Sequence, residues 1–118
     1  MTTLDNIIDT EQLLRNTSRD RELISELMFI FERELPALEA QLTNALRQGD
    51  FPAIEQTVHK LKGSLLMFGA RCVSLAGSVE LDAKRGGAPS FPELCEDLKT
   101  EAARVIPALE ALLKAGEL

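Results

Sequence analysis

The 118-residue sequence has no tryptophan, no tyrosine and only two cysteines, and aromatic residues make up 4% of it. Leucine, isoleucine, valine and alanine must therefore fill the core, and such a composition favours helices. Two cysteines are too few for a disulfide scaffold, so we expect Cys72 and Cys95 to be core or half-buried thiols. No apolar run is long enough to cross a bilayer and no signal peptide begins the chain, which predicts a cytoplasmic protein with no membrane span.

Several kinds of chemistry are also missing. The net charge of −6 argues against a broad basic face for nucleic acid. The chain has one histidine, His59, and no H-x-x-x-H or C-x-x-C spacing, so we predict no metal site. No G-x-x-x-x-G-K loop is present, so the chain should not phosphorylate itself from ATP. Ser64 lies five residues after His59 and therefore on another helix face, which argues against a Ser–His–Asp enzyme.

The length fits a single domain over residues 1–118, and no strand pattern or internal repeat occurs. We predict an all-α fold, an antiparallel four-helix bundle of up-down-up-down topology with a short additional N-terminal helix that lies across its end. The expected elements are a leader with a short helix over about residues 1–16, a long helix to about Gln48 with a bend at Pro36, a histidine helix over about 51–69 and a helix over about 71–85. A last helix should begin with a capping box at Ser90, and Pro107 is where we expect a kink in it.

The histidine helix has one apolar stripe and carries its histidine on the other side. The stripe consists of Ile54, Val58, Leu61, Leu65, Phe68 and Cys72, spaced three or four residues apart. His59 lies roughly 140° from the centre of this stripe and should face outward. Lys62 and Gly63 follow one turn later, so both are neighbours of His59 on the helix surface.

Gly63 is unusual because a glycine inside a helix costs about 1 kcal/mol relative to alanine. It points away from the apolar stripe, so close helix packing explains it poorly. The other explanation is clearance, because a missing Cβ lets a bulky group approach the imidazole of His59. An exposed imidazole, a gap and the ammonium of Lys62 suit a phosphoryl group carried on His59, with Lys62 neutralising its charge.

The run His59-Lys60-Leu61-Lys62-Gly63-Ser64, followed by Gly69-Ala70, resembles the H-x-L-K-G-S…G-A signature of histidine-containing phosphotransfer (HPt) domains, which are carriers in phosphorelays. The similarity extends from about Ile7 to the C-terminus. One departure is Leu65, where many members have a second small residue, but a leucine fits the core stripe.

The resemblance implies a mechanism and partners. A response-regulator receiver domain would present a phospho-aspartate with its own Mg²⁺, and neutral His59 would attack the phosphorus in a reversible step, so the chain itself needs no cofactor. Lys62 would stabilise the phosphohistidine. A hybrid histidine kinase is the expected upstream partner, and the carrier is expected to be monomeric and no enzyme by itself.

Other residues are candidates for partner binding: Glu55, Gln56, Lys60, Gly63, Ser64 and Leu66. Either Glu55 or Gln56 could bond the second ring nitrogen of His59, and side-chain direction does not choose between them. Leu66 is either a docking contact or an edge-of-core residue. Lys84 and Arg85 are either phosphate or partner contacts or solvated charges at a helix end.

Two alternative functions stay open at this point. The chain could be the phosphotransfer domain of a larger histidine kinase, although its initiator Met1 and its length lead us to expect a free-standing protein. It could also be a helical adaptor that binds receiver domains without carrying phosphate, although an adaptor has no need of His59 and Lys62.

Overall fold

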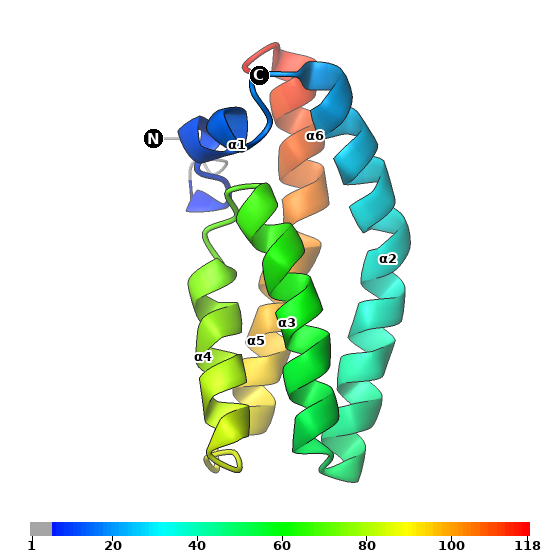
Figure 1. Ribbon diagram of the computed structural model, residues 1–118, viewed down its shortest axis with the longest axis vertical. Helices are drawn as coiled ribbons and strands as arrows, with labels where there is room; N and C mark the ends of the chain where they lie inside the picture. Colours follow the sequence, from blue (N-terminus) through cyan, green and yellow to red (C-terminus); the bar gives the residue numbers. More distant parts are fainter. Residues whose placement is uncertain (1–5) are drawn as a thin grey trace.

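The computed structural model describes residues 6–118, and every regular element in that range is a helix (Figure 1). The helices are α1 (Thr10–Asn16), α2 (Arg21–Gln48), α3 (Phe51–Met67), α4 (Val73–Lys84), α5 (Phe91–Ala103) and α6 (Val105–Ala115). The predicted all-α class is confirmed. The predicted C-terminal helix is divided into α5 and α6, so the described residues hold one helix more than expected.

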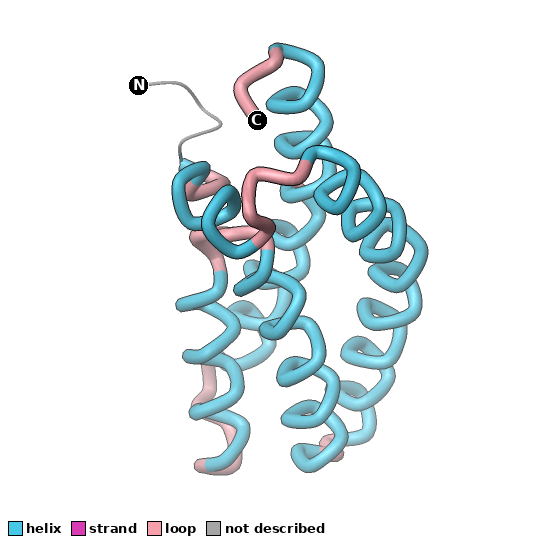
Figure 2. Tube along the Cα trace, turned by 45° about the horizontal axis from the view of Figure 1, so that its top comes forward, coloured by secondary structure: helices cyan, strands magenta, loops and turns pink. Residues whose placement is uncertain are grey.

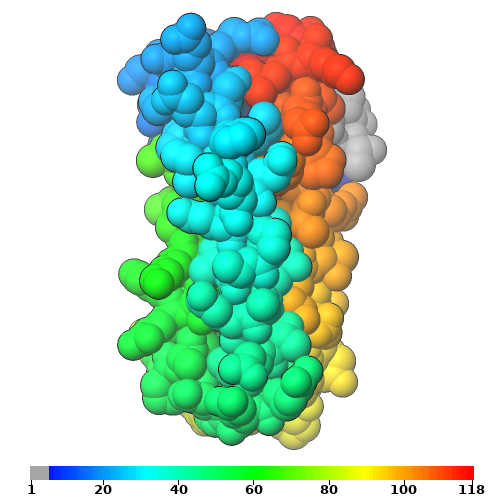
Figure 3. Space-filling model, turned by 90° about the vertical axis from the view of Figure 1, so that its right-hand side faces the viewer, coloured from blue at the N-terminus to red at the C-terminus, as the bar shows by residue number. Residues whose placement is uncertain are grey.

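The long helices lie side by side along an elongated molecule of 43 × 27 × 19 Å. Helix α3 packs against α2 on one side and α4 on the other, and α5 packs against α4 and α2. Helix α6 extends the molecule beyond α5 and packs on α2, so that α2 runs between the green α3 and the orange C-terminal helices in Figure 3. Helix α1 lies across the end of the bundle, as expected (Figure 2).

The core consists almost entirely of aliphatic side chains, and it includes the predicted stripe of α3. Ile54, Val58 and Leu65 are fully buried, and Leu61 and Phe68 nearly so. Phe68 also contacts Phe31 of α2, with 5.5 Å between the ring centroids. Burying one such side chain contributes about 1.5–3 kcal/mol, so this stripe fixes which side of α3 faces solvent. Cys95 is buried and Cys72 half-buried; both are free thiols, and burial raises each pKa to about 11.

The helix ends follow the sequence signals at the start of α3. Gly49 ends α2 in the left-handed region with φ of 65°, and the Asp50 carboxylate accepts a hydrogen bond from the Ala53 N–H at 3.2 Å. Pro36 lies inside α2, which continues through it and curves along its length in Figure 1. These features agree with the predicted bend, stop and cap.

Three local predictions need correction. No side-chain cap bond forms at Ser90, because its backbone lies near ψ of 6° instead of the extended conformation that a capping box uses. The last helix breaks at Arg104 because Pro107 supplies no N–H for the carbonyl of residue 103. Helix α3 ends at Met67, two residues early, because Phe68 is its cap and Gly69 has φ of +67°.

Gly69 is also the point where the N-terminal segment joins the bundle. The Asp9 N–H donates to the Gly69 carbonyl at 2.7 Å, and the Arg71 N–H donates to the Ile7 carbonyl at 2.9 Å. Asn16, at the end of α1, donates to the carbonyls of Leu66 and Met67, both at 3.1 Å. Helix α1 therefore caps the C-terminal end of α3.

We predict that Gly69→Ala lowers the free energy of unfolding by about 2–4 kcal/mol. A Cβ there would lie 2.6 Å from the Asp9 carbonyl oxygen and 3.1 Å from the Leu13 nitrogen, in a backbone region that alanine avoids. Gly49→Ala is the matched control, because Gly49 has φ of +65° but open space around it, and it should cost only about 1–2 kcal/mol. Urea unfolding measures both; equal losses would mean that the contact with the α1 segment contributes nothing.

Candidate functional site

His59 lies on the solvent-facing side of α3, as its place outside the stripe predicts. Its side chain is 74% exposed. One ring nitrogen, Nδ1, lies 3.2 Å from Oε2 of Glu80, which α4 supplies across the α3–α4 contact. The ring is thus held at one edge, and its other nitrogen, Nε2, is left without a hydrogen bond among the described residues.

Glu80 connects the histidine to the lysine of the motif. Its second carboxylate oxygen, Oε1, accepts a hydrogen bond from Lys62 Nζ at 2.8 Å, and its side chain is only 14% exposed. The hydrogen bond from Lys62 lowers the pKa of the Glu80 carboxyl below its usual 4.5; His59 lowers it further, and burial opposes the shift. Glu80 is therefore a carboxylate at neutral pH and accepts hydrogen bonds from both neighbours.

This carboxylate determines the protonation of the neutral imidazole. A carboxylate can only accept a hydrogen bond, so the neutral ring carries its proton on Nδ1, next to Glu80. The lone pair then lies on Nε2, at the opposite edge of the ring. Sequence reasoning offered Glu55 or Gln56 as the partner of the second nitrogen; that choice is wrong, because the hydrogen bond is made by Glu80.

Glu55 and Gln56 still line the same hollow as the imidazole ring. Six residues line an open hollow of about 400 Å³ between α3 and α4: Glu55, Gln56, His59, Lys60, Glu80 and Lys84. Two lysines, Lys60 and Lys84, line this hollow; for Lys84 the sequence had left open whether it contacts a ligand or is a solvated charge. Lys62 is not among the lining residues, and its ammonium is hydrogen-bonded to Glu80. Arg85 does not line it either.

A second depression lies on the other flank of α3, against α2. This groove of about 320 Å³ is lined by Leu27, Ile30, Phe31, Glu34, Lys60, Gly63, Ser64, Met67 and Phe68. A Cβ built on Gly63 would meet no atom within 4 Å, so helix packing does not account for this glycine and the surface beside His59 is open there. Leu66 is 59% exposed, so the edge-of-core interpretation of this residue is wrong.

Glu80 is the site residue that sequence reasoning missed. The buried stripe of α4 is Ala76, Val79 and Ala83, and Glu80 lies at the edge of that stripe, four residues after Ala76. A carboxylate at the edge of a buried face is a signal for a cationic partner on the next helix. The sequence alone does not say which residue of α3 lies opposite, because that depends on the register of α3 and α4.

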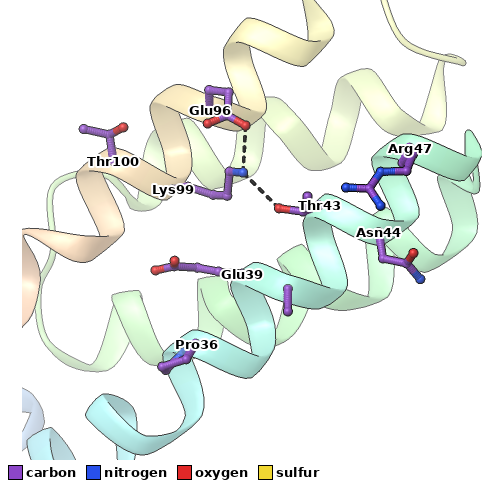
Figure 4. Close-up of a pocket in the computed structure, with 9 residues that line it drawn as sticks. Pro36, Glu39, Thr43, Asn44, Arg47, Glu96, Lys99 and Thr100 are labelled. Atoms are coloured by element: carbon purple, nitrogen blue, oxygen red, sulfur yellow. Dashed lines mark hydrogen bonds and ion pairs between the residues drawn. The ribbon is translucent and has the colours of Figure 1, made fainter.

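A larger depression on another face has no part in this arrangement. It lies between α2 and α5 (Figure 4), measures about 670 Å³, and is lined by Pro36, Glu39, Ala40, Thr43, Asn44, Arg47, Glu96, Lys99 and Thr100. Lys99 crosses it, donating to Thr43 Oγ1 at 2.9 Å and pairing with Glu96 at 2.7 Å. No residue of α3 lines this pocket, so pocket size alone would not identify the site around His59.

Comparison with known proteins identifies the family. The family model described as Hpt domain matches residues 26–116, which include α3, α4 and the whole histidine motif. The chain belongs to the Hpt domain family. The predicted family is thereby confirmed, and membership gives the chain the role of a phosphotransfer domain.

A solved structure agrees with the fold of this Hpt domain. The crystal structure of the HPT domain from the Hpt sensor hybrid histidine kinase of Shewanella superposes with a TM-score of 0.78, over 95% of this chain and 97% of that one. The two sequences are 22% identical, so the likeness concerns the fold alone. A search of curated proteins gives no match.

Two further observations concern the Hpt domain between residues 6 and 118. None of its helices is long and apolar enough to cross a membrane. No group of three or more histidine, cysteine, aspartate or glutamate side chains in that range is placed to hold a metal ion.

The titration of Glu80 gives a test of this site. Because its pKa is lowered in the folded protein, this carboxylate adds to the free energy of unfolding at neutral pH, and the contribution is lost as pH falls below 4.5 towards the folded-state value. We predict that Lys62→Met raises the Glu80 pKa back towards 4.5, as measured by ¹³C NMR of the side-chain carboxyl. Lys84→Met is the control, because Lys84 lines the same hollow without bonding Glu80. An equal shift in both variants would show that the Lys62 contact is not the cause.

Proposed function

We propose that this Hpt domain is a phosphocarrier that accepts a phosphoryl group on His59 from a receiver-domain phospho-aspartate, or from a kinase, and passes it to another receiver domain. The observation that supports this most directly is the exposed imidazole with Nδ1 bonded to Glu80 and Nε2 free in the described structure. Such a ring is held in one orientation with its nucleophilic lone pair towards solvent, where a partner can reach it.

The step proposed is a direct, in-line displacement at phosphorus. The Nε2 lone pair of His59 forms the P–N bond while the P–O bond to the donor aspartate breaks, and the electron pair of that bond stays on the aspartate as a carboxylate. Transfer to the next receiver is the same step in reverse, with an aspartate oxygen attacking and Nε2 leaving. The carrier contributes position and charge, and the receiver contributes Mg²⁺ and its acidic pocket.

The cations around the hollow support the binding of the transferred group. A phosphoryl group on Nε2 would lie on the edge of the ring opposite Glu80, and two lysines, Lys60 and Lys84, line the same hollow as the imidazole. The Lys62 ammonium is hydrogen-bonded to Glu80 at 2.8 Å. To contact the phosphoryl oxygens it must leave Glu80 or share its three protons between the two groups. We therefore propose Lys60 and Lys84, together with Lys62, as the residues that can contact the phosphoryl oxygens.

The receiver is proposed to dock over the face of α3 that carries His59. Basic residues are concentrated there in a chain of net charge −6, which suits an acidic receiver pocket. The groove that contains Gly63 and Ser64, together with exposed Leu66, Met67 and Ile30, provides apolar contact area around the imidazole. Glu55 and Gln56 would lie at the other edge of the contact.

The remaining parts of the proposal concern context. We propose a monomeric, cytoplasmic carrier with no ATP site and no cofactor of its own, whose upstream donor is a hybrid histidine kinase. The antiparallel up-down-up-down course of the bundle is part of this proposal, and the packing of α3 against both α2 and α4 supports it. A place within a longer kinase chain is the alternative context, and it leaves the chemistry of His59 unchanged.

A helical adaptor without phosphate is the second candidate function. Apolar docking area alone would serve such an adaptor, but the network of His59, Glu80 and Lys62 would then have no purpose on an exposed face. Incubation with a receiver that carries phosphate on its aspartate distinguishes the two, because only a carrier acquires acid-labile phosphate.

We predict that His59→Gln abolishes phosphate acceptance and changes the free energy of unfolding by less than about 0.5 kcal/mol, because the side chain is exposed. The assay is transfer of ³²P from a phosphorylated receiver, followed by acid treatment. Ser78→Ala, on the exposed side of α4, is a control that should accept phosphate normally. Acid-labile label on the His59→Gln protein would refute the assignment of the acceptor.

Substitutions of Gly63 distinguish the two explanations for this glycine, clearance for a partner and close helix packing. Gly63→Ala should fold with equal or higher stability, by up to about 1 kcal/mol, since a Cβ there meets open space. Gly63→Gln should also fold, yet transfer should be slowed at least tenfold, because a long side chain beside His59 obstructs the partner's approach. Thermal melts and transfer rates on both variants give the answer. A loss of roughly 1–3 kcal/mol with normal transfer would favour the packing explanation.

A further inference from the structure

Glu80 contacts the nitrogen of His59 that the phosphoryl group does not use. We propose that Glu80 is a positioning residue that keeps a proton on Nδ1 while the phosphoryl group is on Nε2, so that imidazole departs as a neutral leaving group when the phosphate moves on. The proposal rests on the proposed function, and it adds a specific role for a residue outside the H-x-L-K-G-S run. It stands on the 3.2 Å contact between Nδ1 and Oε2 and on the second contact that holds the carboxylate.

The proton count requires such a group. The neutral ring begins with its proton on Nδ1 and attacks through Nε2, so the phosphorylated ring has both nitrogens substituted and carries a positive charge. If the Nδ1 proton then leaves to solvent, the later break of the P–N bond must expel an imidazolate anion, a poor leaving group. If the proton stays, the bond electrons return to Nε2, and the departing ring is the neutral Nδ1–H imidazole with which the cycle began.

The charges that face the ring show why Glu80 is suited to this role. From α3 these are Glu55, Lys60 and Lys62, and from α4 they are Glu80 and Lys84. The three lysines oppose a positive ring, and Glu55 makes no hydrogen bond to it in the structure. Glu80 is the carboxylate in hydrogen-bond contact with Nδ1, and Lys62 fixes its orientation through the other oxygen.

The consequence is a carrier that holds its phosphate in a reactive form. A phosphorylated ring with its Nδ1 proton loses phosphate readily, to water or to an aspartate. Without the carboxylate, the ring gives up this proton at a lower pH, and at neutral pH the phosphohistidine lasts longer and donates more slowly. A purely structural role for Glu80 would change folding but would not move the pH dependence of phosphate loss.

The experiment uses phosphoramidate, a small phosphodonor that labels the histidine without any receiver. The chain's single histidine gives one phosphohistidine signal in ³¹P NMR, and its loss is followed between pH 5 and 9 in the wild type and in Glu80→Gln. Glutamine still accepts a hydrogen bond from Nδ1–H but has no charge. We expect phosphohistidine lifetimes at pH 7 about three- to tenfold longer in Glu80→Gln, with the acid acceleration beginning at a lower pH.

Two controls make the result decisive. Glu110→Gln makes the same charge change at an exposed position of α6 and should match the wild type. Glu80→Gln in a Lys62→Met background tests whether a freed lysine causes the effect, because a lysine effect would vanish there. An effect of Glu80→Gln that disappears in the Lys62→Met background, or an unchanged pH profile, overturns the proposal.

The ¹⁵N NMR spectrum of the unphosphorylated wild-type imidazole is a second measurement. The proposal requires the Nδ1–H form of the neutral ring, and a ring protonated on Nε2 would refute it even if phosphoramidate labelled the protein poorly. If the proposed phosphocarrier function is wrong but the role of Glu80 is right, the outcome differs: no receiver would transfer phosphate to the chain, while phosphate loss from the phosphoramidate-labelled ring would still depend on Glu80.

Discussion

The burial of one face of α3 between α2 and α4 is the constraint on which the rest of the structure depends. Five side chains of the stripe are excluded from water, and this packing fixes the rotation of the helix about its axis. His59 is then exposed because of where it lies between stripe positions, while the register of α3 against α4 brings Glu80 to its Nδ1. A slip of one turn between the two helices would keep the core apolar but would separate the imidazole from its carboxylate.

Both ends of α3 are fixed by backbone polar groups, which resist such a slip. Asp50 caps the first turn, and Asn16 and the segment around Asp9 take up the carbonyls at the far end. Gly69, the first residue of the Gly-Ala pair in the motif, makes this junction possible because only a residue without Cβ fits beside the Asp9 carbonyl. The Gly69-Ala70 part of the motif thus helps to fix the position of α3, while the run from His59 to Ser64 supplies the imidazole and the residues beside it.

Most of the fold could be predicted from the sequence because it depends on local signals. The stripe of α3, the stop at Gly49 and the exposure of His59 follow from helical periodicity and from backbone preferences. The break at Arg104 also has a local cause, because Pro107 supplies no N–H for the carbonyl of residue 103, but the sequence predicted a kink there and not a division into two helices. The absence of a cap bond at Ser90 depends on the backbone conformation of that residue, which the sequence pattern does not fix. Glu80 could not be predicted as the partner of His59, because the two residues are 21 positions apart and lie on different helices.

The position of Lys62 changes how the motif itself is understood. An ammonium one turn from a histidine suggests a direct contact with phosphate, yet here it lies 2.8 Å from Glu80, a carboxylate of low exposure. A cation at that point favours the ionised form of Glu80 and holds one of its oxygens, so the lysine acts on His59 through the carboxylate. In the proposed cycle, a phosphoryl dianion on Nε2 would give Lys62 a second anion to bind besides Glu80. The division of its protons between the two anions would then link the protonation of Nδ1 to the charge on Nε2, which is how the proposed carrier could use one exposed ring both as acceptor and as donor.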